Sequence, residues 1–267
     1  MLVNKELREK LNELFYLIKL QNSQFQSSLD KQVKIEQVLA YLEIIHAELR
    51  RTSAKRKLVL IDSAAGNCYL SYLIYYFYRE LEGRELEIHC VDHNAKLMRQ
   101  NEKLARRMNF DDLYFHAGDI DTFSLEKEVD AVYSLHACDT ATDKTMFMGL
   151  RLQARFIFSV ACCQNSIQIK SGLLKSVIRH KAFRDKALMM IADSMRALLL
   201  EKGGYKVDIF DFVSSRFTDK NTMVRAVRKS FKKVLNLDEE YERIYQEFKM
   251  KPHLEFLLKQ QEEKEVV

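Results

Sequence analysis

From residue 57 onward, short apolar runs alternate with longer segments in which apolar residues recur at helical spacing. This alternation predicts buried parallel strands connected by helices, and hence an α/β fold. The predicted strands cover 57–62, 86–91, 113–116, 131–135, 156–160, 205–213 and 223–227. The predicted helices cover 67–81, 95–108, 140–152 and 184–202, the last of which ends at Gly203 and Gly204.

Helical patterns also flank this alternating region. Two amphipathic segments precede it, over 3–20 and 30–50, and Asp30 is the predicted N-cap of the second. A further helical segment, 238–261, is interrupted by Pro252. The patterns predict three parts, namely a helical cap over 1–52, a sheet domain over 53–233 and a helical tail over 234–267.

The composition supports a folded protein with a sizeable core. The chain has 267 residues, of which 47% are hydrophobic, enough for one large domain and an appendage. No apolar run approaches the roughly 18 residues that span a bilayer, so no membrane segment is expected. The charged, amphipathic N-terminus does not resemble a secretory signal. Five cysteines, an odd number, predict reduced thiols and a cytoplasmic location.

The net charge of +5 is unevenly distributed. Basic residues gather in 50–57, 170–186 and 216–233, whereas the chain after Asp238 is acidic. Such segregation predicts a polyanionic partner. A solvated surface is the alternative for any one of these stretches.

The most informative stretch is 57–71, KLVLIDSAAGNCYLS. A buried strand ends at Asp62, a turn of small residues follows, and Asn67 is the predicted cap of the next helix. This is the strand–turn–helix opening of a nucleotide-binding βαβ unit, in which small residues let a ligand approach the backbone. The turn lacks Gly-Lys-Ser/Thr, which excludes a P-loop, and it has one glycine where the dinucleotide fingerprint has three. A core turn without a ligand is the alternative.

Three motifs together resemble a known superfamily. The pattern D-x-x-x-G-x-x-Y over 62–69 resembles motif I of the class I S-adenosylmethionine-dependent methyltransferases. LHACDTATD over 135–143 and CCQ over 162–164 resemble one branch of that superfamily, and the resemblance covers about 31–228. It implies a Rossmann-like sheet of seven strands, the last one antiparallel, with an N-terminal helical cap and a C-terminal helix. It also implies S-adenosylmethionine as cofactor and methyl transfer as activity.

The resemblance implies cofactor contacts where the first four strands end. Asp92 is expected to accept hydrogen bonds from the ribose hydroxyls; a helix cap is its alternative role, which Asn94 fits better. Asp119 is expected to meet the adenine amino group and Ile120 to pack on the ring, with a simple turn as the alternative. The implied cofactor residues are Asp62, Ser63, Ala64, Gly66, Asn67, Asp92, His93, Asp119, Ile120 and Leu135.

Two residues after the fourth strand are the candidate catalytic groups. His136 is a candidate general base if the methyl acceptor must lose a proton. Asp139 either orients the substrate or caps the helix that begins at Thr140, and capping is the favoured role.

The CCQ segment allows three interpretations. A thiolate could attack a pyrimidine ring, but the Pro-Cys motif of such enzymes is absent. Both cysteines could bind zinc with His136 and Cys138, but neither pair has C-x-x-C spacing and adjacent cysteines chelate poorly. The favoured interpretation is a pocket wall of small, soft residues, with Gln164 as hydrogen-bonding group and Cys163 beside the substrate. No metal site is therefore predicted.

The segment FTDKN over 217–221 resembles the T-x-K-N element of this branch. Lys220 and Asn221, with Arg216 and Arg225 nearby, are candidates for binding a phosphate backbone, and a polar hairpin turn is the alternative. The Asn/Asp-Pro-Pro-aromatic motif is absent, which weakens methylation of an exocyclic adenine amine. The leading hypothesis is a methyltransferase of RNA, either tRNA or rRNA, bound through the three basic stretches. The alternatives are methylation of a small molecule or a protein, and a binding protein without turnover.

Overall fold

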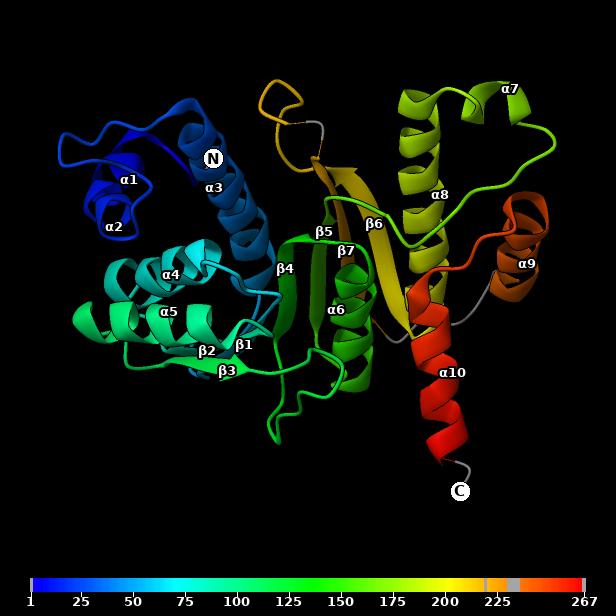
Figure 1. The fold of residues 1–267 in the computed structure, drawn as a ribbon. Helices are drawn as coiled ribbons and strands as arrows, with labels where there is room; N and C mark the ends of the chain where they lie inside the picture. The colour runs from blue at the N-terminus through cyan, green and yellow to red at the C-terminus, as the bar shows by residue number, and fades with distance from the viewer. Residues whose placement is uncertain (1, 219, 230–235, 266–267) are drawn as a thin grey trace. The chain divides into compact units, whose positions relative to one another are not determined.

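The computed structural model describes residues 2–218, 220–229 and 236–265. The chain divides into two compact units (Figure 1). Unit 1 comprises Met1–Asp119 and Asp211–Thr222, and unit 2 comprises Ile120–Phe210 and Met223–Val267. Unit 1 contains the predicted helical cap and the first predicted strands. Unit 2 contains the LHACDTATD and CCQ motifs and the predicted tail.

Unit 1 is built on three parallel strands in the order β3-β2-β1. They are β1 (Leu58–Ser63), β2 (Leu86–Asp92) and β3 (Leu113–Ala117). Every residue of β1 and β2 is buried. This explains the apolar run that opens β1, whereas β2 also buries the polar side chains of Glu87 and His89. Ser63 pairs with Val91, and Asp92 pairs with Ala117, so the three strands end at one edge.

The helices of unit 1 are α1 (Lys5–Lys10), α2 (Asn12–Leu17), α3 (Leu29–Leu49), α4 (Tyr69–Tyr76), the π-helix η1 (Phe77–Leu81) and α5 (Ala95–Arg107). Helix α4 packs on β2, and α5 packs on β2 and β3 (Figure 1). The predicted helix over 3–20 is interrupted at Leu11, which separates α1 from α2. The predicted Asp30 cap is wrong, because α3 begins one residue earlier with Ser28 in the N-cap position.

Unit 2 contains β4 (Ala131–Ala137), β5 (Phe156–Ala161) and most of β6 (Tyr205–Asp211) and β7 (Thr222–Arg228), in the order β4-β5-β7-β6. Strand β5 is parallel to β4, but β7 is antiparallel to β5, with Phe156 opposite Val227. The described residues thus form seven strands, and the last one is antiparallel. This arrangement confirms the predicted class I, Rossmann-like fold.

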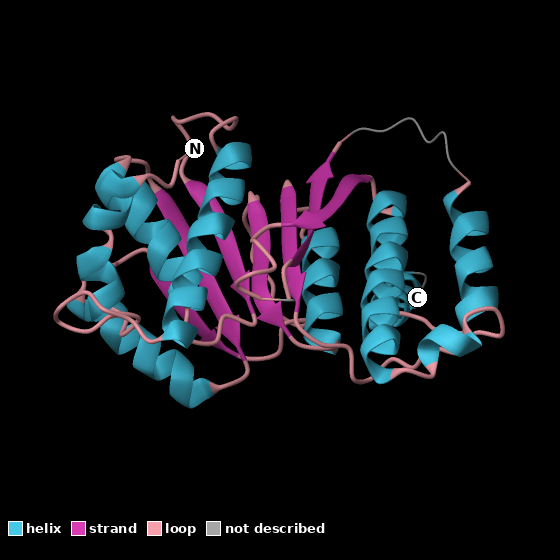
Figure 2. Ribbon diagram, turned by 90° about the horizontal axis from the view of Figure 1, so that it is seen from above, coloured by secondary structure: helices cyan, strands magenta, loops and turns pink. Residues whose placement is uncertain are grey.

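The helices of unit 2 are α6 (Thr140–Arg151), α7 (Lys175–Ile178), α8 (Lys181–Lys202), α9 (Leu237–Phe248) and α10 (His253–Glu265). Helices flank the strands within each unit (Figure 2), and α6 packs on β4, β5, α8 and α10. Residues from α8, β7 and α10, including Met195, Val224 and Leu254, share one hydrophobic core. Helix α8 begins three residues earlier than predicted. None of the described helices combines the length and apolar character that a bilayer span requires.

Candidate functional site

The turn after β1 has an unusual backbone. Ala64, Gly66 and Cys68 have φ angles of 58°, 53° and 55°, in the left-handed region. Such angles suit glycine, whereas other residues pay about 1–2 kcal/mol each. A Cβ on Gly66 would meet only the Ala64 carbonyl oxygen, at 4.0 Å, so the backbone angle rather than lack of space requires glycine. Strain of this kind persists where the surrounding structure fixes it, often at a functional site.

Asp92, at the end of β2, fixes this turn. Its Oδ2 accepts a hydrogen bond from the Gly66 N–H at 3.0 Å, and its Oδ1 accepts one from the Asn94 N–H at 2.9 Å. A carboxylate offers about four acceptor positions. The two hydrogen bonds use two of them and the His93 Nδ1 lies 3.5 Å from Oδ1, so capacity for a ribose hydroxyl remains chiefly at Oδ2. The Gly118 N–H donates to the Asp92 carbonyl oxygen at 3.1 Å, which brings the predicted Asp119 beside the same edge. The end of β2 and the turn after β1 therefore place acceptor groups and backbone at one edge of the unit, where the resemblance puts the cofactor.

Asn101 of α5 also fixes the turn, although no sequence pattern pointed to it. Its Nδ2 donates to the Gly66 carbonyl oxygen at 2.8 Å and lies 3.2 Å from the Cys68 sulfur. Asn101 is buried and more than thirty residues away along the chain. It stands in a strongly polar helix, where one more amide carries no visible signal.

Asp62 supports the turn from within the unit. The carboxylate is buried and accepts a hydrogen bond from the Ser71 hydroxyl at 2.5 Å, which ties β1 to α4. Burial raises the pKa of Asp62 to about 7; the Ser71 hydrogen bond opposes this shift and the charge of Asp92 adds to it. The neighbouring Ser63 is fully buried.

The helix caps differ in part from the prediction. Asn67 is not the cap of α4, because Cys68 occupies the N-cap position and makes no side-chain capping bond. The left-handed backbone of Cys68 delays the helix by one residue and leaves Asn67 exposed. Asn94, which the sequence favoured over Asp92 as the cap of α5, does cap that helix, since its side chain accepts a hydrogen bond from the Leu97 N–H at 3.1 Å. The His93 side chain is 93% exposed, and its Nδ1 lies 3.5 Å from Asp92 Oδ1.

A pocket of about 380 Å³ in unit 1 lies beside α4 and α5. Its lining includes Tyr69, Asn101, Lys103 and Arg107, and Asn67 is its one residue from the predicted cofactor set. The cofactor assignment therefore rests on Asp92 and the turn rather than on this pocket. Ile120 and Leu135, the remaining predicted cofactor residues, belong to unit 2, where Ile120 is buried and Leu135 is half-buried.

In unit 2, the end of β4 is irregular. Leu135 pairs with Val160 and Ala137 with Ala161, which leaves His136 as the extra residue of a bulge. His136 has a φ of 63°, and Asp139 has a φ of 55°. Bulges are common next to active sites, where they redirect a side chain. The candidate base therefore stands at a distorted position of the strand.

Asp139 connects the LHACDTATD loop to the segment after β5. Its carboxylate accepts hydrogen bonds from the Ser166 N–H at 3.0 Å and the Ser166 hydroxyl at 2.5 Å. Its own N–H donates to the Cys163 carbonyl oxygen at 3.1 Å. Asp139 occupies the N-cap position of α6, but its side chain makes no capping bond, so the favoured capping role is wrong. Thr140 and Ser166 line a second pocket of about 380 Å³ with residues that begin α10.

A buried arginine in α8 joins the two signature motifs, and no sequence pattern pointed to it. Arg196 is fully buried. It donates to both carboxylate oxygens of Asp143 at 2.8 and 2.7 Å, to Asp193 at 3.0 Å and to Gln164 Oε1 at 3.0 Å. Asp143 belongs to LHACDTATD and Gln164 to CCQ. The Gln164 Nε2 is buried and has no hydrogen-bond partner among the described residues.

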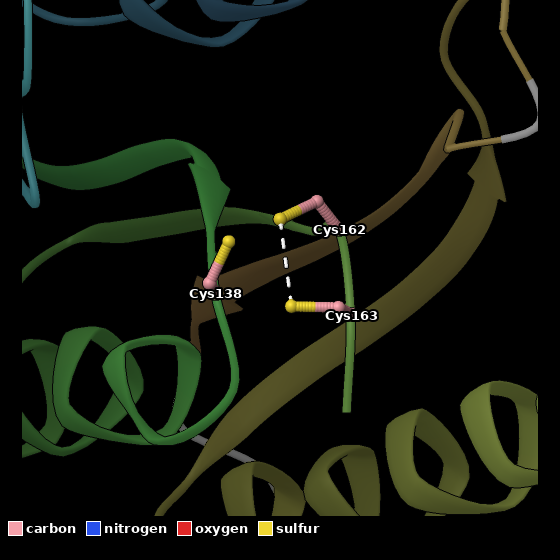
Figure 3. Close-up of side chains that lie close together, drawn as sticks. All are labelled: Cys138, Cys162 and Cys163. Carbon is pink, nitrogen blue, oxygen red and sulfur yellow. Dashed lines mark hydrogen bonds between the residues drawn. The ribbon is translucent and has the colours of Figure 1, made fainter. Parts of the chain in front are cut away.

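Three cysteines of unit 2 lie together (Figure 3). Cys138 follows β4 and is exposed, whereas Cys162 and Cys163 follow β5 and are half-buried. Their sulfur atoms all lie within 4.8 Å of one another. Burial, and next the neighbouring Cys138 thiol, raise the pKa of both Cys162 and Cys163. Nucleophilic attack requires a thiolate, so these two thiols are poorly suited to the attack considered from the sequence.

The loop between β6 and β7 exposes one of its two predicted site residues, Lys220, and buries the other, Asn221. Asn221 is buried; its Nδ2 donates to the Val213 carbonyl oxygen at 3.0 Å, and its own carbonyl oxygen accepts from the Phe212 N–H at 2.9 Å. Its side chain therefore closes the loop. Lys220 is exposed, as is Arg216. Of the candidates in this loop, Lys220 and Arg216 are thus accessible to a phosphate group, whereas the Asn221 side chain is not.

Comparison with known proteins assigns the chain to a family. Residues 33–170 match the family described as a methyltransferase domain, and no curated protein matches the chain. The CMeT domain of the citrinin polyketide synthase is 11% identical, with a TM-score of 0.51 over 85% of this chain and 58% of that one. The CurJ carbon methyltransferase is 13% identical, with a TM-score of 0.51 over 84% of this chain and 58% of that one.

These structural matches show a shared fold, and the chain spans a little over half the length of both proteins. The family match covers residues 33–170, more than half of the 267 residues. The chain therefore belongs to the methyltransferase domain family and has the fold of class I S-adenosylmethionine-dependent methyltransferases.

Proposed function

We propose that this protein binds S-adenosylmethionine at the turn after β1 and transfers the methyl group to RNA. When bound, the cofactor supplies a methyl group activated by a positively charged sulfur. The chain's own contribution is then chiefly alignment and exclusion of water. The cofactor half of the proposal is supported by the acceptor capacity that Asp92 keeps beside a turn whose backbone it fixes.

The observation that best supports RNA is the basic stretch 170–186, which directly follows the CCQ motif in the same unit. Lys181 and Arg184 pair with Asp185. The other four cations are exposed and form no ion pair with any residue that the structure describes; they are Lys170, Lys175, Arg179 and Lys186. A series of exposed, unpaired cations suits a chain of phosphates, whose binding releases counterions.

The other two basic stretches support the proposal less strongly. In 50–57, Lys57 is held by Asp112 and Glu87. In 216–233, Arg225 pairs with Asp208 at 2.9 Å, and residues 230–233 lie outside the described part. Exposed cations remain at Arg216, Lys220, Arg228 and Lys229.

In this proposal, the residues that follow β4 and β5 act on the acceptor. His136, in the bulge, accepts the proton that the acceptor atom loses. Asp139, held by Ser166, orients the substrate. Gln164 donates its remaining hydrogen bonds to the acceptor, and Cys163 packs beside it.

A small-molecule acceptor is the second candidate function. The pocket that Thr140 and Ser166 share with the start of α10 has a volume of about 380 Å³, within the range of small-ligand sites. Lys251 and Lys259 line it together with Glu255, which pairs with both at 3.0 and 2.7 Å, so the lining mixes charges of both signs.

Tritium transfer from labelled S-adenosylmethionine into cell RNA, protein and metabolite fractions separates these functions. The proposal expects label in RNA. Label confined to metabolites or protein would refute the RNA acceptor, and no label in any fraction would refute methyl transfer.

RNA affinity as a function of salt tests the basic stretch itself. The triple variant Lys175→Ala/Arg179→Ala/Lys186→Ala should lower the salt slope by about 2, since each phosphate contact on a single strand contributes about 0.7. The control Lys5→Ala/Lys10→Ala/Lys31→Ala removes the same charge from the N-terminal helices and should keep the slope. Equal slopes for both triple variants would contradict the proposed contact.

A further inference from the structure

The cysteine cluster of unit 2 brings together sulfur atoms from two segments of the chain. Cys138 comes from the loop after β4, and Cys162 and Cys163 from the segment after β5. The three sulfur atoms point into a common space (Figure 3). The Cys162 and Cys163 sulfurs are 3.9 Å apart, and no pair in the cluster is separated by more than 4.8 Å.

These distances resemble those between ligands of one metal ion. Thiolates bind Zn²⁺ at about 2.3 Å in a tetrahedron, which places neighbouring sulfurs about 3.8 Å apart. A disulfide needs about 2.05 Å, far below the observed 3.9 Å. Cys138 is exposed, so its side chain can rotate to close the longer separations without disturbing a core.

Hydrogen bonds hold the two cysteine-bearing segments together. The Asp139 N–H donates to the Cys163 carbonyl oxygen at 3.1 Å, and the Asp139 carboxylate accepts from Ser166. The sulfur atoms of Cys138 and Cys162 lie 3.7 and 3.5 Å from the same carbonyl oxygen, that of His136. The three cysteines therefore stand on two loops that hydrogen bonds hold side by side.

We propose that Cys138, Cys162 and Cys163 bind one Zn²⁺ ion through their three sulfur atoms, with the fourth position open to water or to a substrate atom. The ligands bind as thiolates, so binding releases their protons to solvent. Three protein ligands and one open position is the arrangement of catalytic rather than structural zinc sites. The sequence argument against zinc rested on the missing C-x-x-C spacing and on the poor chelation expected of adjacent cysteines. In the structure, the Cys162 and Cys163 sulfurs are 3.9 Å apart and the Cys138 sulfur lies within 4.8 Å of both. The site goes beyond the proposed function and holds whether or not the acceptor is RNA.

The test uses the full chain, reduced and freed of metal, with Co²⁺ as a spectroscopic probe and Zn²⁺ as competitor. The site should bind one Co²⁺ per chain with a thiolate-to-cobalt charge-transfer band, and Zn²⁺ should abolish that band. Loss of a group that merely supports a ligand costs about 10- to 100-fold in affinity. Loss of a ligand in Cys138→Ser, Cys162→Ser or Cys163→Ser should therefore weaken Zn²⁺ binding at least about 100-fold.

Cys138→Ser is the decisive variant, because Cys138 is exposed and its substitution leaves the core intact. Cys90→Ala is the matched control, since Cys90 is buried in β2 of unit 1 and should leave the affinity unchanged. Absence of the charge-transfer band in the unsubstituted protein would overturn the proposal. So would a Cys138→Ser variant that is folded by circular dichroism and binds Zn²⁺ as tightly as the control.

Discussion

Replacing Arg196 with methionine should destabilise the protein more than most single substitutions. The guanidinium is fully buried and donates four hydrogen bonds, of which three go to Asp143 and Asp193 and one to Gln164. Methionine keeps much of the volume but removes the positive charge. The variant leaves two buried carboxylates without their cation.

The magnitude follows from what remains in the core. Breaking a buried ion pair by removing one partner costs about 3–5 kcal/mol, because the other charge is left uncompensated. At about 2–4 °C per kcal/mol, the melting temperature should fall by about 6–20 °C. Burial already raises the pKa of Asp193 even with Arg196 present. Without Arg196, both carboxyls should take up protons in the folded state, so the loss should be larger at pH 8 than at pH 5.

Urea unfolding followed by circular dichroism measures the free energy of unfolding, and an unchanged slope shows that the same structure unfolds. Arg184→Met on the same helix is the matched control. Arg184 is about half exposed, so its loss should change stability by no more than about 0.5 kcal/mol. A loss below about 1 kcal/mol for Arg196→Met would refute the view that this network holds the two motifs together.

Two further predictions concern the supports of each unit. Gly149→Ala would place a Cβ 2.5 Å from two Ile157 side-chain carbons. The free energy of unfolding, measured with urea, should therefore fall by about 1–3 kcal/mol. An unchanged free energy would contradict the packing of α6 on β5. The pKa of Asp62 is raised to about 7, above the roughly 3.9 of an unfolded chain. The stability that the protonated Asp62 carboxyl contributes is therefore fully present below about pH 4 and is lost as the pH rises through 7. Asp62→Asn should therefore flatten the dependence of unfolding free energy on pH between about 4 and 7, and parallel curves for the two proteins would count against a buried carboxyl.

The strands could be predicted because each is a local pattern, whereas the antiparallel direction of the last strand was implied by the resemblance to class I methyltransferases. The apolar run of β1 reflects complete burial, which the sequence shows directly. In β2, Glu87 and His89 are buried as well, and their polar character does not reveal it. Helix starts were less predictable. Asn67 is a good capping residue by type, but the left-handed Cys68 takes that position, and no local pattern gives a cysteine that backbone angle.

The parts of the site that depend on distant residues could not be predicted. Arg196 lies 53 residues from Asp143, and along α8 it falls among apolar positions that suggest an ordinary buried face. The sequence analysis did group Cys138 with Cys162 and Cys163, but the approach of their sulfurs to within 4.8 Å depends on the pairing of β4 with β5 and could not be read from residue spacing. The motifs identified which segments of the chain carry the candidate site residues. The contacts between those segments depend on tertiary structure and could not be predicted from the motifs.

The central claim is that the turn after β1 binds S-adenosylmethionine through Asp92. Titration calorimetry of the unsubstituted protein, Asp92→Asn and the control Asp111→Ala tests it directly, since Asp111 is an exposed carboxylate of the same unit. Hydrogen bonds to a charged group are worth about 1.5–3 kcal/mol, so Asp92→Asn should bind about 10- to 100-fold more weakly, while Asp111→Ala matches the unsubstituted protein. Equal affinity for all three proteins, or no binding to the unsubstituted protein, would contradict the account.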